Sequence, residues 1–248
     1  MQLPRYWRYI RATNELSVFY NASVLNMPSP EDVRLLGLRY LVVPTGLEPP
    51  VEGEIVEEAG GYSLWELDDA QPLATTSGGE VRYADDIQQA LDLVTAPGFD
   101  PSTVTIAERS IGATPLADLQ PAAATVEARS PTEISIRMDP SVGGVLTVRN
   151  AYEAGWRATA DGRVADTLPV DGFLQGVVLP SGTREVLLTY HDDAVMLGLA
   201  LGAAIWSILL AAPFIALLLE RRSASGRGAS GRAASGRPTR SLPRPPAA

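Results

Sequence analysis

The stretch AVMLGLALGAAIWSILLAAPFIALLL, residues 194–219, decides the architecture of this chain. It contains no charged side chain, and Ser207 is its only polar residue. A bilayer core of about 30 Å requires about 20 apolar helical residues, so this stretch is long enough to span it with some tilt. A buried helix of a soluble protein is disfavoured because the stretch is apolar on every face. The sequence therefore predicts one transmembrane helix from Ala194 to Leu219.

The charges on either side of this helix predict its orientation. Residues 191–193 (HDD) precede it, residues 220–222 (ERR) follow it, and five more arginines lie beyond. By the positive-inside rule, Arg221 and Arg222 form a cytoplasmic anchor and the N-terminal region is extracytoplasmic. Residues 1–193 contain 28 acidic and 13 basic side chains, a net charge of −15, whereas the remainder carries +6. The acidic body argues against nucleic acid as a partner, because phosphates require a basic surface.

Residues 220–248 form an arginine-rich tail with three similar pentads, SASGR, GASGR and AASGR, and a proline-rich end. A segment of Gly, Ser, Pro and Arg without large apolar residues cannot bury a core, so we predict a disordered cytoplasmic tail. Attraction of these arginines to anionic lipid headgroups is one possible role. A simple extension that sets the topology is the interpretation we favour.

The composition excludes several kinds of site. The chain has no cysteine, which excludes disulfides and thiolate chemistry, and its single histidine, His191, excludes a multi-histidine zinc site. Pairs of adjacent acidic residues do not provide the two facing carboxylates that glycoside hydrolysis requires. We therefore predict no metal, no cofactor and no catalytic residue.

We divide the region before the transmembrane helix into a lead-in (residues 1–19), a small α/β layer (20–120) and a β-sandwich (121–193). In the α/β layer, Ser29 followed by Pro30 is typical of a helix start, and Gly37 of its end. A buried strand is predicted at 39–44, a hairpin about Gly60-Gly61, and a second helix at 84–95.

From about residue 121 to 190 the pattern changes to short alternating runs separated by turn residues. Asp161-Gly162 is a strong two-residue hairpin signal between two of these runs. Several short strands at this spacing are typical of an antiparallel β-sandwich. The predicted fold class is therefore α+β: a small α/β layer, an antiparallel β-sandwich, and one C-terminal transmembrane helix.

The aromatic residues of the sandwich suggest a binding role. Tyr152 and Trp156 are candidates for stacking against a sugar, because aromatic faces on a β-sandwich can pack on saccharide rings. The alternative, which we favour for Trp156 and Phe173, is that they anchor the core, since large aromatic side chains dominate small cores.

Three strings resemble the C-terminal part of the YfhO family of bacterial multi-spanning membrane proteins. They are QLPRYWRYIRA (2–12), NASVLNMPSPEDVRLLGLRYLVVP (21–44), and residues 154–199, beginning AGWRATADGRVADTL. The last is the most specific: an aromatic, Gly-Trp, an Asp-Gly hairpin, a glycine-containing turn, and a closing tyrosine strand before a membrane helix. The matching positions are Tyr152, Gly155, Trp156, Asp161, Gly162, Gly182 and Tyr190.

The resemblance implies a role beside glycosyl transfer from lipid-linked sugars to envelope polymers such as teichoic acids. It implies a catalytic acid in an early loop between membrane helices, and this sequence has no such loop. The first hypothesis is therefore an extracytoplasmic accessory module in a bacterial cell membrane, whose partners are the bilayer, a lipid-linked sugar or envelope polymer, and a remaining membrane subunit. The alternative is a stand-alone single-pass protein whose sandwich binds a partner protein or wall polymer.

The first residues, MQLPRYWRYIRATNEL, contain no hydrophobic signal core, although residues 1–193 are predicted to lie outside the membrane. Two explanations stay open. The chain is the end of a longer multi-spanning protein, or the body is cytoplasmic and the arginine-rich tail crosses the membrane.

Overall fold

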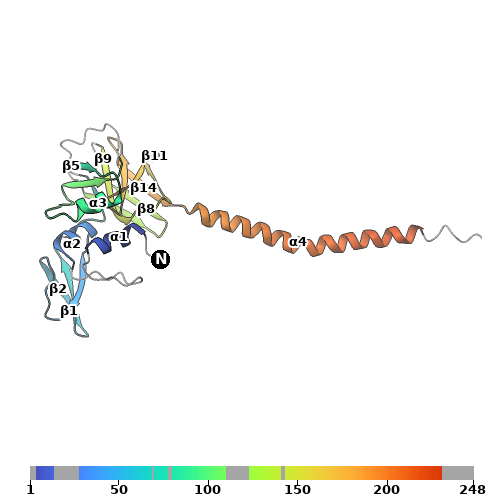
Figure 1. The fold of residues 1–248 in the computed structure, drawn as a ribbon, viewed down its shortest axis with the longest axis horizontal. Coiled ribbons are helices and arrows are strands. Elements are labelled where there is room, and N and C mark those ends of the chain that lie inside the picture. Colours follow the sequence, from blue (N-terminus) through green and yellow to red (C-terminus); the bar gives the residue numbers. More distant parts are fainter. Residues whose placement is uncertain are drawn as a thin grey trace, which may run out of the picture. The chain divides into compact units, whose positions relative to one another are not determined.

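The computed structural model describes residues 4–13, 28–68, 70–77, 80–109, 123–140 and 143–230. The chain forms two compact units, Met1–His191 and Asp192–Ala248, and each is described by itself (Figure 1). The boundary between the units falls where the sequence predicts the transmembrane helix to begin.

Within the described ranges, the first unit contains three helices and fourteen strands. The helices are α1 (Pro4–Thr13), α2 (Pro30–Leu36) and α3 (Ile87–Val94). The strands of the first half are β1 (Tyr40–Pro44), β2 (Gly53–Ala59), β3 (Tyr62–Leu67), β4 (Ala74–Thr76), β5 (Glu80–Tyr83), β6 (Val104–Ala107) and β7 (Ala123–Arg129). Those of the second half are β8 (Glu133–Arg137), β9 (Gly144–Ala151), β10 (Trp156–Ala160), β11 (Arg163–Ala165), β12 (Thr167–Val170), β13 (Leu174–Leu179) and β14 (Glu185–Tyr190).

Eleven of these strands form one curled sheet, in the order β11-β10-β14-β8-β7-β4-β9-β13-β12-β6-β5. The short strand β4 pairs with β7 on one side and with β9 on the other, so it joins two halves that face each other as a sandwich. Ile136, Leu146, Val177 and Leu188 lie in the core of this sandwich and are fully buried. The predicted α+β fold with a β-sandwich and a C-terminal apolar helix is confirmed.

A second core lies on the other face of the half that contains β9. Helices α1 and α3 contribute Tyr9, Ile10 and Leu91 to it, strand β9 contributes Val145, and the β12–β13 turn contributes Phe173. Because successive side chains of a strand point to opposite faces, Val145 enters the helical core while its neighbour Leu146 enters the sandwich core. Strand β9 is therefore buried on both faces.

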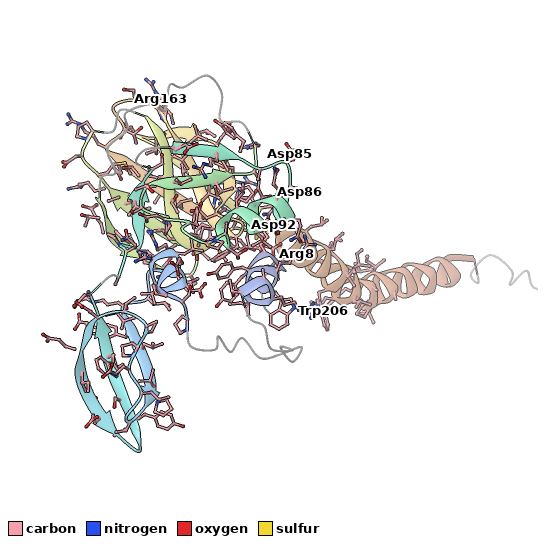
Figure 2. The ribbon with its side chains drawn as sticks, turned by 60° about the vertical axis from the view of Figure 1, so that its left-hand side comes forward. Arg8, Asp85, Asp86, Asp92, Arg163 and Trp206 are labelled. Carbon is pink, nitrogen blue, oxygen red and sulfur yellow. The ribbon has the colours of Figure 1, made fainter. Side chains whose placement is uncertain are left out.

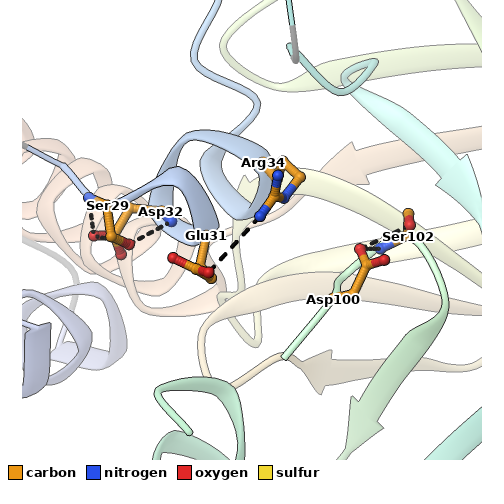
Figure 3. Close-up of polar contacts among 6 residues, drawn as sticks. All are labelled: Ser29, Glu31, Asp32, Arg34, Asp100 and Ser102. Atoms are coloured by element: carbon orange, nitrogen blue, oxygen red, sulfur yellow. Dashed lines mark hydrogen bonds and ion pairs between the residues drawn. The ribbon is translucent and has the colours of Figure 1, made fainter. Parts of the chain in front are cut away.

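Local signals explain several element boundaries. Ser29 and Asp32 form a capping box at the start of α2, and Gly37 ends this helix in the left-handed region with φ of 63° (Figure 3). Asp161 and Gly162 make the β10–β11 turn with φ of 46° and 76°, as the hairpin signal predicts. Gly60 and Gly61 likewise connect β2 and β3 with positive φ.

The structure differs from the sequence predictions in three places of the first unit. Strand β1, predicted as buried, is largely exposed, because it is an edge strand of a separate three-stranded sheet ordered β1-β3-β2. The lead-in contains helix α1, whose buried face holds Tyr9 and Ile10. Strands from both sides of residue 120 share the large sheet, and the predicted boundary at that residue lies outside the described residues.

The second unit contains helix α4 (Asp193–Ser230). Among the described residues, the stretch Asp193–Leu218 is the one helix long and apolar enough to cross a membrane, and none of it is buried against protein. The helical backbone continues through Ser230, beyond the predicted end at Leu219, so residues 220–230 are helical and their predicted disorder is wrong. Residues 231–248 of the predicted disordered tail lie outside the described residues.

A buried carboxyl group fixes the turn between β12 and β13. Asp171, with φ of 49°, donates its backbone N–H to the carbonyl of Ile106 over 2.7 Å and accepts the Ile106 N–H at Oδ1 over 2.8 Å. Burial raises the pKa of Asp171 to about 7, although the hydrogen bond from Ile106 and the charge of Arg149 oppose the rise. Burial also lowers the pKa of Arg149 to about 10, so its guanidinium stays protonated and is satisfied by the carbonyl of Pro72.

The pKa of Asp171 predicts how the stability of the fold depends on pH. An unfolded aspartate releases its proton near pH 4, whereas the native one keeps it to about pH 7. The native state therefore binds more protons between these values, and the free energy of unfolding falls as pH rises through this window. Asp171→Asn keeps the acceptor oxygen and removes the titration. Relative to wild type, we expect the variant to gain stability between pH 5 and pH 8, by at most a few kcal/mol.

The measurement is urea unfolding of the full chain in lipid nanodiscs, followed by tryptophan fluorescence at both pH values. Asp85→Asn, at an exposed position, is the control and should follow wild type. A difference between Asp171→Asn and wild type that is the same at pH 5 and pH 8 would contradict the assignment.

Candidate functional site

The candidate site is built around Trp156, the first residue of β10. Its partner across the sheet is Tyr190 at the end of β14, and the two rings meet edge to face with centroids 5.4 Å apart. Trp156 is 7% exposed and belongs to the sandwich core, which confirms the core interpretation. Its predicted role in stacking on a sugar stays a prediction.

Gly155 allows this close packing. A Cβ atom built at this position would lie 2.6 Å from Cε2 of Tyr190 and 2.7 Å from the carbonyl oxygen of His191. The Gly155 carbonyl accepts the backbone N–H of His191 over 2.9 Å, which closes the end of the β10–β14 pair. The glycine in the turn before β10 marks a close approach that any side chain would hinder.

A groove of about 470 Å³ lies beside Trp156. Its polar lining includes Arg157 and Thr159 of β10, Asp166 after β11, Arg109 after β6, and His191 after β14. Arg109 donates a hydrogen bond to the carbonyl of Thr167 over 2.8 Å and lies 4.0 Å from Asp166, so its position is fixed by the adjoining strand. These residues come from four different segments that only the folded sheet brings together.

The chemistry of this groove suits a polyhydroxylated ligand. Thr159, Thr167 and Thr189 provide hydroxyl groups, Asp166 accepts hydrogen bonds, and the arginines donate them. Donors and acceptors placed together in this way orient a polar ligand through hydrogen bonds.

Tyr152, the second sequence candidate, lies elsewhere in the first unit. It does not line the groove; the guanidinium of Arg5 lies 5.5 Å from its ring centroid, and its backbone N–H donates to Phe173 over 2.7 Å. Phe173 itself is 2% exposed and stacks on Tyr9, which confirms its core role. The structure therefore brings Trp156, but not Tyr152, to the groove.

Sequence reasoning did not single out Arg109, Arg157 and Asp166. Alternation along β10 could have suggested Arg157, because a residue next to a core tryptophan in a strand points to the opposite face. Arg109 and Asp166 are separated by more than fifty positions, and their proximity depends on the pairing of β12 with β6.

Two members of the adjacent acidic pairs cap helices. Asp86 caps α3 by accepting the backbone N–H of Gln89 over 2.9 Å. Asp32 completes the capping box of α2 and accepts a hydrogen bond from the hydroxyl of Tyr9. Among the described residues, no group of three His, Cys, Asp or Glu side chains is placed to hold a metal ion.

Comparison with known proteins gives a weak structural likeness. No protein-family model matches the chain, and no curated protein matches it. Solved structures of the arabinofuranosyltransferase AftD from Mycobacteria match at 26% identity over 32% of this chain, with a TM-score of 0.27. A mutant of the same enzyme matches at 28% identity over 31% of this chain, with a TM-score of 0.26. The match covers only 6% of the length of these structures. The arabinofuranosyltransferase activity in their names therefore belongs to those proteins and is not assigned to this chain.

The close approach at Gly155 predicts the effect of a methyl group. Gly155→Ala should destabilise the first unit by about 1–3 kcal/mol, because the new Cβ displaces the Tyr190 ring or the His191 carbonyl. Thermal unfolding in nanodiscs measures the loss. Gly198→Ala is the control, since a Cβ there meets no atom within 4 Å. A melting temperature for Gly155→Ala equal to that of the control would show that the packing at Trp156 and Tyr190 is not tight.

Proposed function

We propose that the chain is a membrane-anchored accessory module of a YfhO-like glycosyl-transfer system, and that its sandwich holds a saccharide of an envelope polymer or of a lipid-linked sugar. The observation that carries this proposal is the groove beside Trp156. Its lining includes threonines, a carboxylate and arginines around about 470 Å³, next to the buried Trp156. That volume falls within the usual range for small-ligand sites.

The position of the groove along the chain supports this proposal. Strand β14, which contributes Thr189 to the lining, leads directly into α4, with only His191 and Asp192 between Tyr190 and the helix start. A site joined to a membrane helix by so short a linker is suited to a substrate whose lipid tail is held in the bilayer. A lining of hydrogen-bond donors and acceptors is suited to holding and positioning a saccharide.

Binding of a saccharide by the full chain in zwitterionic nanodiscs tests the proposal. The probes are a neutral hexasaccharide and a glycerol-phosphate oligomer, with binding measured by calorimetry. Arg157→Gln and Asp166→Asn should each weaken binding of the better probe by about 5–10-fold, as expected for a lost hydrogen bond to a charged group.

Arg137→Gln is the matched control for these variants. Arg137 lies on β8 of the same half-sheet, is ion-paired with Glu127 over 3.0 Å, and does not line the groove. Failure of both probes to bind wild type, or equal weakening by Arg137→Gln, would remove the support for a saccharide site.

The proposed orientation is extracytoplasmic for the first unit and cytoplasmic for the arginine-rich end. The chain lacks cysteine, so single introduced cysteines report position without background. We expect Val164→Cys, at a residue that is 91% exposed, to react with a membrane-impermeant maleimide in intact cells. Ser241→Cys should react only after the membrane is permeabilised. The reverse pattern would show a cytoplasmic body.

A further inference from the structure

The three-stranded sheet β1-β3-β2 has a face that is rich in exposed apolar residues. Residues directly opposite in antiparallel strands lie on one face. The registers Val42↔Leu64 and Leu64↔Glu57 therefore place these three side chains together, and Tyr40↔Glu66 and Glu66↔Glu54 extend the same face. We call this surface the acidic sheet face; it comprises Tyr40, Val42, Tyr62, Leu64, Glu54, Glu57 and Glu66.

The two faces of this sheet differ in burial. On the acidic sheet face, Tyr40, Val42 and Tyr62 are 50%, 62% and 54% exposed. On the opposite face, Val43 of β1 and Leu67 of β3 are each 3% exposed, whereas Ile55 of β2 is 49% exposed. Figure 2 draws the side chains of this sheet on both sides of its ribbon. Neighbouring exposed aromatic and branched side chains are typical of an interaction surface, whereas single ones are not.

The charge around this face is predominantly negative. Between residues 39 and 68 the chain has seven acidic side chains and one basic one, Arg39. Arg39 donates to Glu66 over 2.7 Å and lies 5.6 Å from the centroid of the Tyr40 ring, so it is engaged within the sheet. The face therefore presents apolar groups in a negative field. Electrostatic complementarity selects a basic partner and opposes both a second copy of this chain and an anionic bilayer.

The edges of the sheet are protected against strand addition. Strand β2 has a register shift between Ile55 and Glu57, and three of its seven residues are glutamates. Strand β1 ends in Pro44, which has no N–H to donate. Bulges, charges and proline at edge strands prevent pairing with a further strand, so contact is expected across the face.

From these observations we infer that the acidic sheet face is a docking surface for a partner protein, and that it contacts a segment in which arginine or lysine alternates with apolar residues. The apolar residues of the segment pack on Tyr40, Val42 and Tyr62, and its cations lie against Glu54 and Glu57. This surface is distinct from the groove beside Trp156, whose lining it does not share.

A synthetic twelve-residue peptide of alternating Arg and Val is the probe, with Glu–Val and Ser–Val peptides as references. Each is titrated by calorimetry against the full chain in zwitterionic nanodiscs, with empty nanodiscs subtracted. We expect measurable binding for the Arg–Val peptide alone. Glu54→Gln with Glu57→Gln should weaken it at least 10-fold and reduce its dependence on salt concentration. Val42→Ser with Tyr62→Ser should weaken it about 10-fold and leave the salt dependence unchanged.

Asp85→Asn with Asp92→Asn is the matched control, because it removes the same charge from exposed positions on and before α3 (Figure 2). Binding should be unchanged in this control. Equal weakening by the control would overturn the inference, since net charge alone would then explain binding. Self-association that Val42→Ser abolishes would assign the face to a second copy, and tighter binding to anionic nanodiscs that Val42→Ser reduces would assign it to lipid. Either result overturns the inference as well.

Discussion

The two-sided burial of β9 is the constraint on which the body of this protein depends. Val145 and Val148 are fully buried on opposite faces of one strand, one in the helical core and the other in the sandwich core. A buried strand of this kind cannot shift its register, because a shift of one residue would exchange every side chain between the two cores. The placement of α1, α3 and the facing half-sheet follows from that fixed register.

Local signals made much of this fold predictable. The cap at Ser29, the turn at Asp161-Gly162 and the apolar run from Ala194 each depend on neighbours in sequence, and each is where the pattern indicated. The exposure of β1 was not predictable in this way. Its run of apolar residues reads as a buried strand, yet whether a strand is covered depends on which sheet it joins.

The candidate site was less predictable from local sequence than the fold. Trp156 was a candidate from the sequence because it is an aromatic residue of the predicted sandwich, but the polar lining around it was not predicted. Arg109, Asp166 and His191 meet only because β6 pairs with β12 and β14 pairs with β10. The residue pattern of a single segment does not indicate which distant strand it pairs with. The residues that line this groove could therefore be identified only from the tertiary fold.

Strand β4 makes the early and late parts of the first unit depend on each other for folding. This three-residue strand, Ala74–Thr76, precedes α3 in the chain and pairs with one strand of each half-sheet. Apart from β5 and β6, the other strands of the large sheet come after residue 122. A cut of the chain between Glu108 and Ala124 would leave the later fragment without β4, the strand that joins its two half-sheets. The earlier fragment would lose the sheet residues on which α1 and α3 pack. The two fragments would have to associate to complete the sheet, as the halves of a split reporter protein do. Expression of either fragment alone would therefore separate parts that fold together.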